Sequence, residues 1–325
     1  MIQNIIISFS SNDWYAEHLA VAIYSLLKHL SEWYFAKIFI LDGWISEKNK
    51  KLITSLWTRF NNGEIEFILM DRSKYEWRNT KGLSQEAYYR LELPELLPTY
   101  EKILYLDVDI IVRGDISQLY NIDISSNSIW AVREITTINY YTDLYNIKSP
   151  FWLFFNSWVL IMNLKKLREI NLKKSVLNFI NTYNEKLIAY DQDALNVILT
   201  QNWTSLHPKY NALPFLRATK KGNVLRYSDN EFKDAKNFPV IVHFAGEKPR
   251  KKNCFHPLSY LYHQYRSEVW LPPINLDWSL RWTAFLKQLL SKFTLYLQAN
   301  LPNRIYRRLI YKPYGLLRFL SKKSH

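Results

Sequence analysis

The stretch at residues 102–112 reads K-I-L-Y-L-D-V-D-I-I-V and places two carboxylates, Asp107 and Asp109, inside an otherwise apolar run. A run this rich in Ile, Leu and Val predicts one central strand of a parallel sheet, buried on both faces. Side chains two residues apart on a strand share a face, so both carboxylates can point toward one position in space. Their burial requires a cation, a neighbouring Arg or Lys, or exposure at the strand end, and the pattern alone leaves all three open.

Strand-like and helix-like segments alternate on both sides of this run. The apolar patterns predict strands at 5–9, 37–41, 64–70, 154–162 and 240–244, and helices at 17–30, 46–60, 84–97, 174–183 and from Asp191 onward. This alternation predicts an α/β fold in which helices cover both faces of a mostly parallel sheet. In such folds, ligands bind beyond the carboxyl ends of the strands.

The composition is that of an ordinary globular protein. The 325 residues are 48% hydrophobic and 22% charged, and the chain is long enough for a core well above the marginal size. The single cysteine, Cys254, excludes an internal disulfide, the first residues lack a signal-peptide pattern, and no apolar run is long enough to span a membrane. These features predict a cytoplasmic protein.

The positive charge gathers at the carboxyl end of the chain. Of the 43 Lys and Arg, ten lie in residues 281–325, which contain none of the 29 Asp and Glu. Apolar residues recur at three- and four-residue spacing between Trp282 and Leu297, with Lys287 and Lys292 on the other side. We therefore divide the chain into a body, residues 1–271, and a basic, aromatic, amphipathic helical appendage, residues 272–325.

Two interpretations of this appendage remain open. It could pack on the body with a solvated basic face, or it could attach the protein to an anionic membrane surface, which explains the aromatic residues and the lack of acids better. The second predicts a peripheral position on the inner face of the cell membrane. Nucleic acid is not an expected partner, because the body carries no nucleic-acid-reading motif.

Three polar clusters fall at the ends of predicted strands, at residues 9–13, 107–109 and 243–249. All three would face one crevice. Asp107, Asp109 and His243 could supply part of the shell of a hard divalent cation, with a diphosphate completing it, and the imidazole would favour Mn²⁺ over Mg²⁺. Lys248 could meet a phosphate as a point charge. Alternatively, His243 is a hydrogen-bonded structural residue and Lys248 a solvated surface lysine.

Six blocks of sequence, in matching order, resemble glycosyltransferase family 8, a group of retaining enzymes with the GT-A fold. The resemblance covers about residues 5–248 and is closest to bacterial enzymes that add galactose or glucose to lipopolysaccharide or lipooligosaccharide. The blocks are N-D-W-Y-A-E-H-L-A-V-A-I-Y-S-L-L after the first strand, Y-Y-R-L-E-L-P-E-L-L-P (88–98), K-I-L-Y-L-D-V-D-I-I-V, F-N-S-W-V-L-I-M-N-L-K-K-L-R (155–168), Y-D-Q-D-A-L-N (190–196) and H-F-A-G-E-K-P (243–249).

The resemblance implies a Rossmann-like GT-A domain that transfers a hexose, galactose or glucose, from a UDP-sugar to a saccharide acceptor, which would be lipid-linked. It implies that Asp107, Asp109 and His243 hold Mn²⁺, or Mg²⁺, against the donor diphosphate. Gly246 and Lys248 would close over the phosphates. Ser10, Asn12, Asp13 and Val108 are the further nucleotide-site candidates; Arg90, Glu134, Asn156, Asp191 and Gln192 are the donor-sugar candidates, with Asp191 and Gln192 as catalytic candidates.

Several of these residues also have a purely structural interpretation. Arg90 could pair with Glu86 on its own helix, Asn156 could form a turn at a strand end, and Asp191 could cap a helix that begins at Gln192.

Four positions depart from the family pattern. Asn12 stands where Asp is usual and Trp14 where Asn is frequent; Trp158 replaces a glycine, and Arg250 stands where Trp is usual. These departures keep open a non-catalytic UDP- or sugar-binding protein of the same fold. A haloacid-dehalogenase-like phosphatase is less favoured, because that family places its D-x-D on an early strand.

Overall fold

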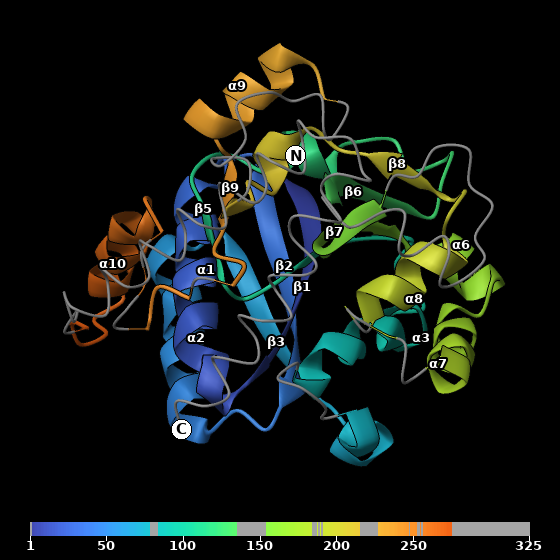
Figure 1. The fold of residues 1–325 in the computed structure, drawn as a ribbon. Helices are drawn as coiled ribbons and strands as arrows, with labels where there is room; N and C mark the ends of the chain where they lie inside the picture. Colours follow the sequence, from blue (N-terminus) through green and yellow to red (C-terminus); the bar gives the residue numbers. More distant parts are fainter. Residues whose placement is uncertain are drawn as a thin grey trace, which may run out of the picture.

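The computed structural model describes residues 2–78, 84–134, 154–183, 187, 189, 191–214, 227–246, 248–251, 254 and 256–274. Its centre is a seven-stranded sheet in the order β3-β2-β1-β4-β7-β6-β8 (Figure 1). The strand pairs are parallel except on the two sides of β7, which runs antiparallel to β4 and β6, so the predicted mostly parallel α/β sheet is confirmed. In spatial order the strands are β3 Gly63–Leu69, β2 Tyr34–Gly43, β1 Gln3–Asn12, β4 Lys102–Leu106, β7 Phe154–Asn163, β6 Ile129–Glu134 and β8 Trp203–Ser205.

Helices cover both faces of this sheet, and its central strands are largely apolar because they supply two cores. In β1, Ile5 and Ile7 pack into one core and Ile6 into the other, as the alternation of side chains on a strand requires. One face carries α1 Ala16–His29, α2 Glu47–Phe60 and α10 Ser259–Glu268; the other carries α3 Leu93–Leu96, α6 Leu164–Glu169, α7 Leu172–Tyr183 and α8 Asp191–Ile198 (Figure 1).

The remaining elements are short and lie between these layers or at their edges. The second sheet has two strands and matters most for the site, since it carries one of the metal-ligand candidates. It consists of β5 Ile110–Val112 and β9 Ile241–His243. The other elements are α4 Ser117–Tyr120, α9 Asp229–Asn237 and the 3-10 helices η1 Asp13–Tyr15, η2 Arg72–Arg78, η3 Gln85–Glu92 and η5 Pro208–Tyr210.

The prediction of one continuous strand over residues 102–112 is wrong. The run is divided into β4, which belongs to the main sheet, and β5, which pairs antiparallel with β9. Between them, the backbone at Asp107 donates to Trp158 O at 2.9 Å, and Asp109 O accepts from Phe244 N at 2.9 Å. The physical reason for the break is that a regular, doubly buried strand would place carboxylates in the apolar layers, whereas the break turns them toward polar partners.

The other expected elements are largely confirmed, with one difference in helix type. The segment expected as a helix over residues 84–97 is mainly the 3-10 helix η3, followed by the short α3. Strands β6 and β8 and helices α4, α6, α9 and α10 are not among the elements expected from the sequence. The appendage at 272–325 lies outside the described residues except for 272–274. Among the described helices, none combines the length and apolar character of a membrane span.

Helix α1 fixes the position of β5 through one buried side chain. Ser25 Oγ donates to Ala22 O at 2.9 Å and accepts from Val112 N at 3.0 Å. We predict that Ser25→Ala lowers the free energy of unfolding by about 1–3 kcal/mol, because it leaves a buried backbone N–H without an acceptor. Chemical denaturation measures this difference.

Ser55→Ala is the matched control. Ser55 makes the same bond to the carbonyl three residues earlier, at 2.7 Å to Leu52 O, but on an exposed face of α2. Among the described residues, no backbone N–H of another element donates to it. Its free energy of unfolding should change by less than about 0.5 kcal/mol. Equal effects of the two substitutions would contradict the role of Ser25.

Candidate active site

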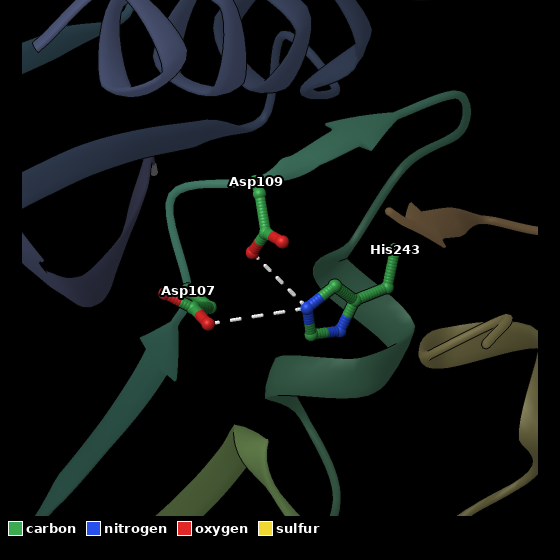
Figure 2. A group of neighbouring side chains, drawn as sticks. All are labelled: Asp107, Asp109 and His243. Atoms are coloured by element: carbon green, nitrogen blue, oxygen red, sulfur yellow. Dashed lines mark hydrogen bonds and ion pairs between the residues drawn. The ribbon is translucent and has the colours of Figure 1, made fainter. Parts of the chain in front are cut away.

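The two acids and the histidine that the sequence singles out converge at the break between β4 and β5. Asp107 directly follows β4, Asp109 directly precedes β5, and the pairing of β5 with β9 sets Ile110 opposite His243. This register brings the imidazole beside Asp109, 134 positions away in sequence. Figure 2 shows the three side chains pointing toward one another from three different segments.

The distances between these groups suit a shared cation. His243 Nε2 lies 3.1 Å from Asp109 Oδ1 and 3.9 Å from Asp107 Oδ2. One ligand atom from each residue falls within 4.8 Å of the others, so the three could hold a metal ion. His243 and Asp109 are fully buried, whereas the Asp107 side chain is 26% exposed and opens the cluster to solvent. Two carboxylates and one imidazole nitrogen form a donor set that fits a divalent cation of the Mn²⁺ or Mg²⁺ type.

Opposite charges already neutralise part of this cluster. Lys248 Nζ forms an ion pair with Asp109 Oδ2. Burial acts to raise the pKa of the Asp109 carboxyl, but the charges of His243 and Lys248 together outweigh it and lower the pKa. Burial and the adjacent Asp109 charge raise the pKa of the Asp107 carboxyl. The Asp109 carboxylate is therefore held as an anion, and Asp107 is the member of the pair whose negative charge has less compensation.

A second polar cluster adjoins the first through β7. Asn156 Nδ2 donates to Glu134 Oε2 at 2.7 Å and approaches Gln192 Oε1 at 3.5 Å. The same Gln192 oxygen accepts from Ser157 N at 2.9 Å. Three of the five donor-sugar candidates, Glu134, Asn156 and Gln192, are thus brought together.

Arg90 and Asp191, the other two donor-sugar candidates, form a buried pair. Arg90 Nε lies 3.4 Å from Asp191 Oδ2, and the guanidinium also donates to Ser157 O and stacks 4.5 Å from the centre of the Tyr105 ring. Within the described part of the chain, the ion pair of Arg90 is made with Asp191 and not with Glu86, so the alternative interpretation of Arg90 is wrong. Burial raises the pKa of Asp191 to about 6, against the lowering effect of Arg90.

At the end of β1, the nucleotide-site candidates Asn12 and Asp13 form hydrogen bonds that stabilise the adjacent helices. Asn12 accepts from Tyr15 N at 3.2 Å and caps η1. Asp13 accepts from Ser46 N and Asn49 Nδ2, both at 2.7 Å, at the start of α2, and these hydrogen bonds lower the pKa of its carboxyl. Ser10 is buried, and Val108 N donates to Asp107 Oδ1 at 2.9 Å. A nucleotide role for these four residues stays a prediction.

The loop after β9 returns to the loop after β1. Gly246 has a φ of +78°, a conformation that favours glycine, and it precedes Lys248 in the turn that brings the ammonium to Asp109. Two residues further, the Arg250 guanidinium lies 4.3 Å from the centre of the Trp14 ring, and its Nη1 donates to Trp14 O at 2.6 Å. Two of the four departures from the family pattern, Trp14 and Arg250, are therefore contact partners.

Asn211 is a buried polar residue of this region that sequence reasoning missed. It lies between η5 and β9, is fully buried, and contacts both His243 and Asn156. No pattern marks it, because a lone Asn next to a turn is ordinary in sequence. Trp158, the third departure, packs edge-on against the His243 ring with a centroid distance of 5.1 Å.

The fold is of the GT-A glycosyltransferase class. A solved structure of the galactosyltransferase LgtC, in complex with donor and acceptor sugar analogs, is similar to this chain with a TM-score of 0.72 and 25% identity. The similarity covers 83% of this chain and 98% of LgtC.

The chain belongs to glycosyl transferase family 8, whose family model matches residues 6–254. General stress protein A of Bacillus subtilis is 32% identical over 263 residues, which cover 79% of this chain and 91% of that protein. The lipopolysaccharide 1,2-glucosyltransferase of Escherichia coli is 25% identical over 244 residues, 74% of this chain and 67% of that protein.

The raised pKa of Asp191 generates a prediction on stability. An acid whose pKa is about 6 in the folded state and about 4 in the unfolded state stabilises the folded state while protonated, and this contribution is lost as the pH rises through 6. The free energy of unfolding of the wild type, relative to Asp191→Asn, should therefore fall by about 3 kcal/mol between about pH 4 and pH 7. Denaturant unfolding of both proteins across this range measures the difference, and parallel pH profiles would contradict it.

Proposed function

We propose that this protein transfers a hexose, glucose or galactose, from a UDP-sugar to a saccharide acceptor with retention of configuration and with the assistance of Mn²⁺ or Mg²⁺. The observation that carries the proposal is the convergence of Asp107, Asp109 and His243 beyond the carboxyl end of β4 in a family 8 fold. Lys248 lies at the same point and Asn156 and Gln192 lie next to it, which supports a donor site that runs from the diphosphate to the sugar.

In this proposal the diphosphate of the donor occupies the break between β4 and β5. A divalent cation bound by Asp107, Asp109 and His243 would supply Lewis-acid neutralisation of the diphosphate charge. Lys248 contributes a second positive charge, and its ammonium would be free to meet a phosphate if a cation were bound to Asp109. Ser10, Asn12, Asp13 and Val108 line the nucleotide side, and Gly246 lets the Lys248 turn approach the phosphates.

The bond between the anomeric carbon and UDP breaks as the bond to the acceptor oxygen forms on the same face of the sugar. The acceptor hydroxyl gives its proton to the leaving diphosphate, so atoms and charges balance. The anomeric carbon becomes positive in the transition state, and the oxygens of Gln192 and Asp191 lower its energy. Arg90 keeps the Asp191 carboxylate in place, and Asn156 and Glu134 hold the donor sugar.

The acceptor is proposed to be lipid-linked. The support is the similarity to a lipopolysaccharide glucosyltransferase together with the basic, aromatic composition of residues 272–325. Attachment of this appendage to an anionic leaflet would hold the enzyme peripherally on the inner face of the cell membrane, within reach of such an acceptor.

A non-catalytic UDP- or sugar-binding protein of the same fold is the second candidate. Trp158 favours it, because this indole packs on His243 where the family usually has a glycine and could limit the space for a sugar. It predicts UDP binding without turnover. Membership of family 8 argues against a haloacid-dehalogenase-like phosphatase.

The proposal predicts release of UDP from UDP-glucose or UDP-galactose that requires a divalent cation. Chelation should abolish the release, and added Mn²⁺ should restore it. The double variant Asp107→Asn, Asp109→Asn should lose on the order of 100-fold or more in rate, because the leaving diphosphate loses its charge compensation. A coupled assay of UDP measures the rate.

Asp123→Asn is the control, because Asp123 is an exposed acid whose hydrogen bonds, within the described part of the chain, are to Ser125. Its rate should equal that of the wild type. UDP release by the double variant at the wild-type rate would refute the metal assignment, and tight UDP binding with no release from any donor would favour the binding protein.

The appendage generates a separate prediction. Truncation after Pro273 should weaken binding to vesicles that contain anionic lipid at least about 10-fold, because each Lys or Arg near such a surface contributes about 1 kcal/mol. Neutral vesicles serve as the control surface. Vesicle sedimentation measures binding, and equal binding of the full-length and truncated proteins would contradict the membrane role.

A further inference from the structure

Asn211 joins the donor-sugar cluster to the metal-ligand cluster. Its Nδ2 donates to Asn156 Oδ1 at 2.8 Å, and its Oδ1 lies 2.8 Å from His243 Nδ1. Asn211, Asn156 and His243 are all fully buried, so water does not compete for these bonds. The chain of contacts runs from Glu134 through two amides and one imidazole to Asp109.

The donor and acceptor roles of Asn156 and Asn211 follow from the groups that contact Asn156. Trp158 N is a backbone donor that lies 3.1 Å from Asn156 Oδ1, and the Glu134 carboxylate accepts from Asn156 Nδ2. Asn156 therefore presents its oxygen, not its amide nitrogen, to Asn211. Asn211 must donate to this oxygen through Nδ2, because the flipped orientation of its amide would place two carbonyl oxygens 2.8 Å apart.

The orientation of the Asn211 amide also determines which nitrogen of His243 carries a hydrogen. With Nδ2 directed to Asn156, Asn211 offers only an acceptor to the imidazole, so His243 Nδ1 carries the hydrogen and donates it. The ring nitrogen that faces Asp109 and Asp107 is then Nε2, which lies at hydrogen-bonding distance, 3.1 Å, from Asp109 Oδ1. A cation held by the two carboxylates would take the place of a hydrogen on Nε2, while Nδ1 keeps its own.

Backbone pairing keeps Asn211 and the imidazole in register. Ala212 N donates to Ile241 O at 2.8 Å, which ties the residue after Asn211 to β9. On the other side of the imidazole, the Trp158 ring lies edge-on at 65° and hinders rotation of the His243 ring. The amide and the imidazole therefore meet without a flexible element between them.

We propose that Asn211 is a positioning residue that selects the Nδ1–H tautomer of His243 and so directs Nε2 to the metal ion. The inference rests on the proposed function of the site, but it concerns a residue that would touch neither metal nor sugar. It also links the two halves of the donor site, because the amide that orients the metal ligand is itself oriented by Asn156.

The first test needs neither metal nor donor. In metal-free protein labelled with ¹⁵N-histidine, nitrogen chemical shifts report whether each ring nitrogen carries a hydrogen. The His243 signals are those missing from the spectrum of His243→Asn. We expect a hydrogen on Nδ1 in the wild type, with or without one on Nε2, and loss of the Nδ1 hydrogen in Asn211→Ala. Wild-type His243 with a hydrogen on Nε2 alone would overturn the proposal.

The second test measures Mn²⁺ affinity by titration calorimetry without donor. Asn211→Ala should weaken binding roughly 10- to 100-fold, the range for loss of a group that orients a metal-bound histidine. Asn163→Ala is the matched control, since it removes a buried amide that bonds to Ile124 O and Lys166 N, away from His243.

These outcomes separate the inference from the proposed function. A wild type that releases UDP with Mn²⁺, together with an Asn211→Ala variant of unchanged tautomer and unchanged Mn²⁺ affinity, would overturn the role of Asn211 and leave the function standing. Equal weakening in Asn211→Ala and Asn163→Ala would also overturn it, because the effect would then be one of general stability. A wild type with the Nδ1–H tautomer and no Mn²⁺ binding would instead contradict the function.

Discussion

The proximity of two carboxylates in a poorly hydrated part of the molecule is the constraint on which the site depends. Asp107 and Asp109 are separated by one residue, and each ionised group makes the other more costly to bury. The structure meets this cost with nearby positive or polarisable groups, namely Lys248, His243 and, at longer range, Arg90. The backbone breaks between β4 and β5 for the same reason, because one continuous buried strand would leave both carboxylates among apolar side chains.

The elements around the break hold those compensating groups at fixed positions. The pairing of β5 with β9 sets His243, the turn after Gly246 returns Lys248, and α1 supports β5 through Ser25. On the other side, β7 carries Asn156, and its Trp158 carbonyl accepts a hydrogen bond from Asp107 N. The metal-ligand cluster and the donor-sugar cluster are therefore built on neighbouring parts of one rigid frame, which is what a reaction across a single glycosidic bond requires.

Much of this architecture could be predicted from the sequence, because local patterns carry it. The alternation of apolar strands with amphipathic helices predicted the sheet, and the D-V-D pattern with His243 and Lys248 predicted which residues would meet. What failed depended on long-range contacts. The apolar pattern continues on both sides of Asp107 and Asp109 without a glycine or a proline, so the sequence does not mark the change of sheet. Asn211, the pairing of Arg90 with Asp191 and the stacking of Arg250 on Trp14 become visible only when distant segments are brought together.

The central claim is that Asp107, Asp109 and His243 form one metal site at the end of β4. Anomalous diffraction at the manganese edge, from crystals grown with Mn²⁺ and UDP, tests it most directly. The account predicts one strong peak within about 2.0–2.3 Å of His243 Nε2 and of an oxygen from each carboxylate, with diphosphate oxygens completing the shell. A peak bound elsewhere, or ordered UDP beside these residues with no metal peak, would contradict it.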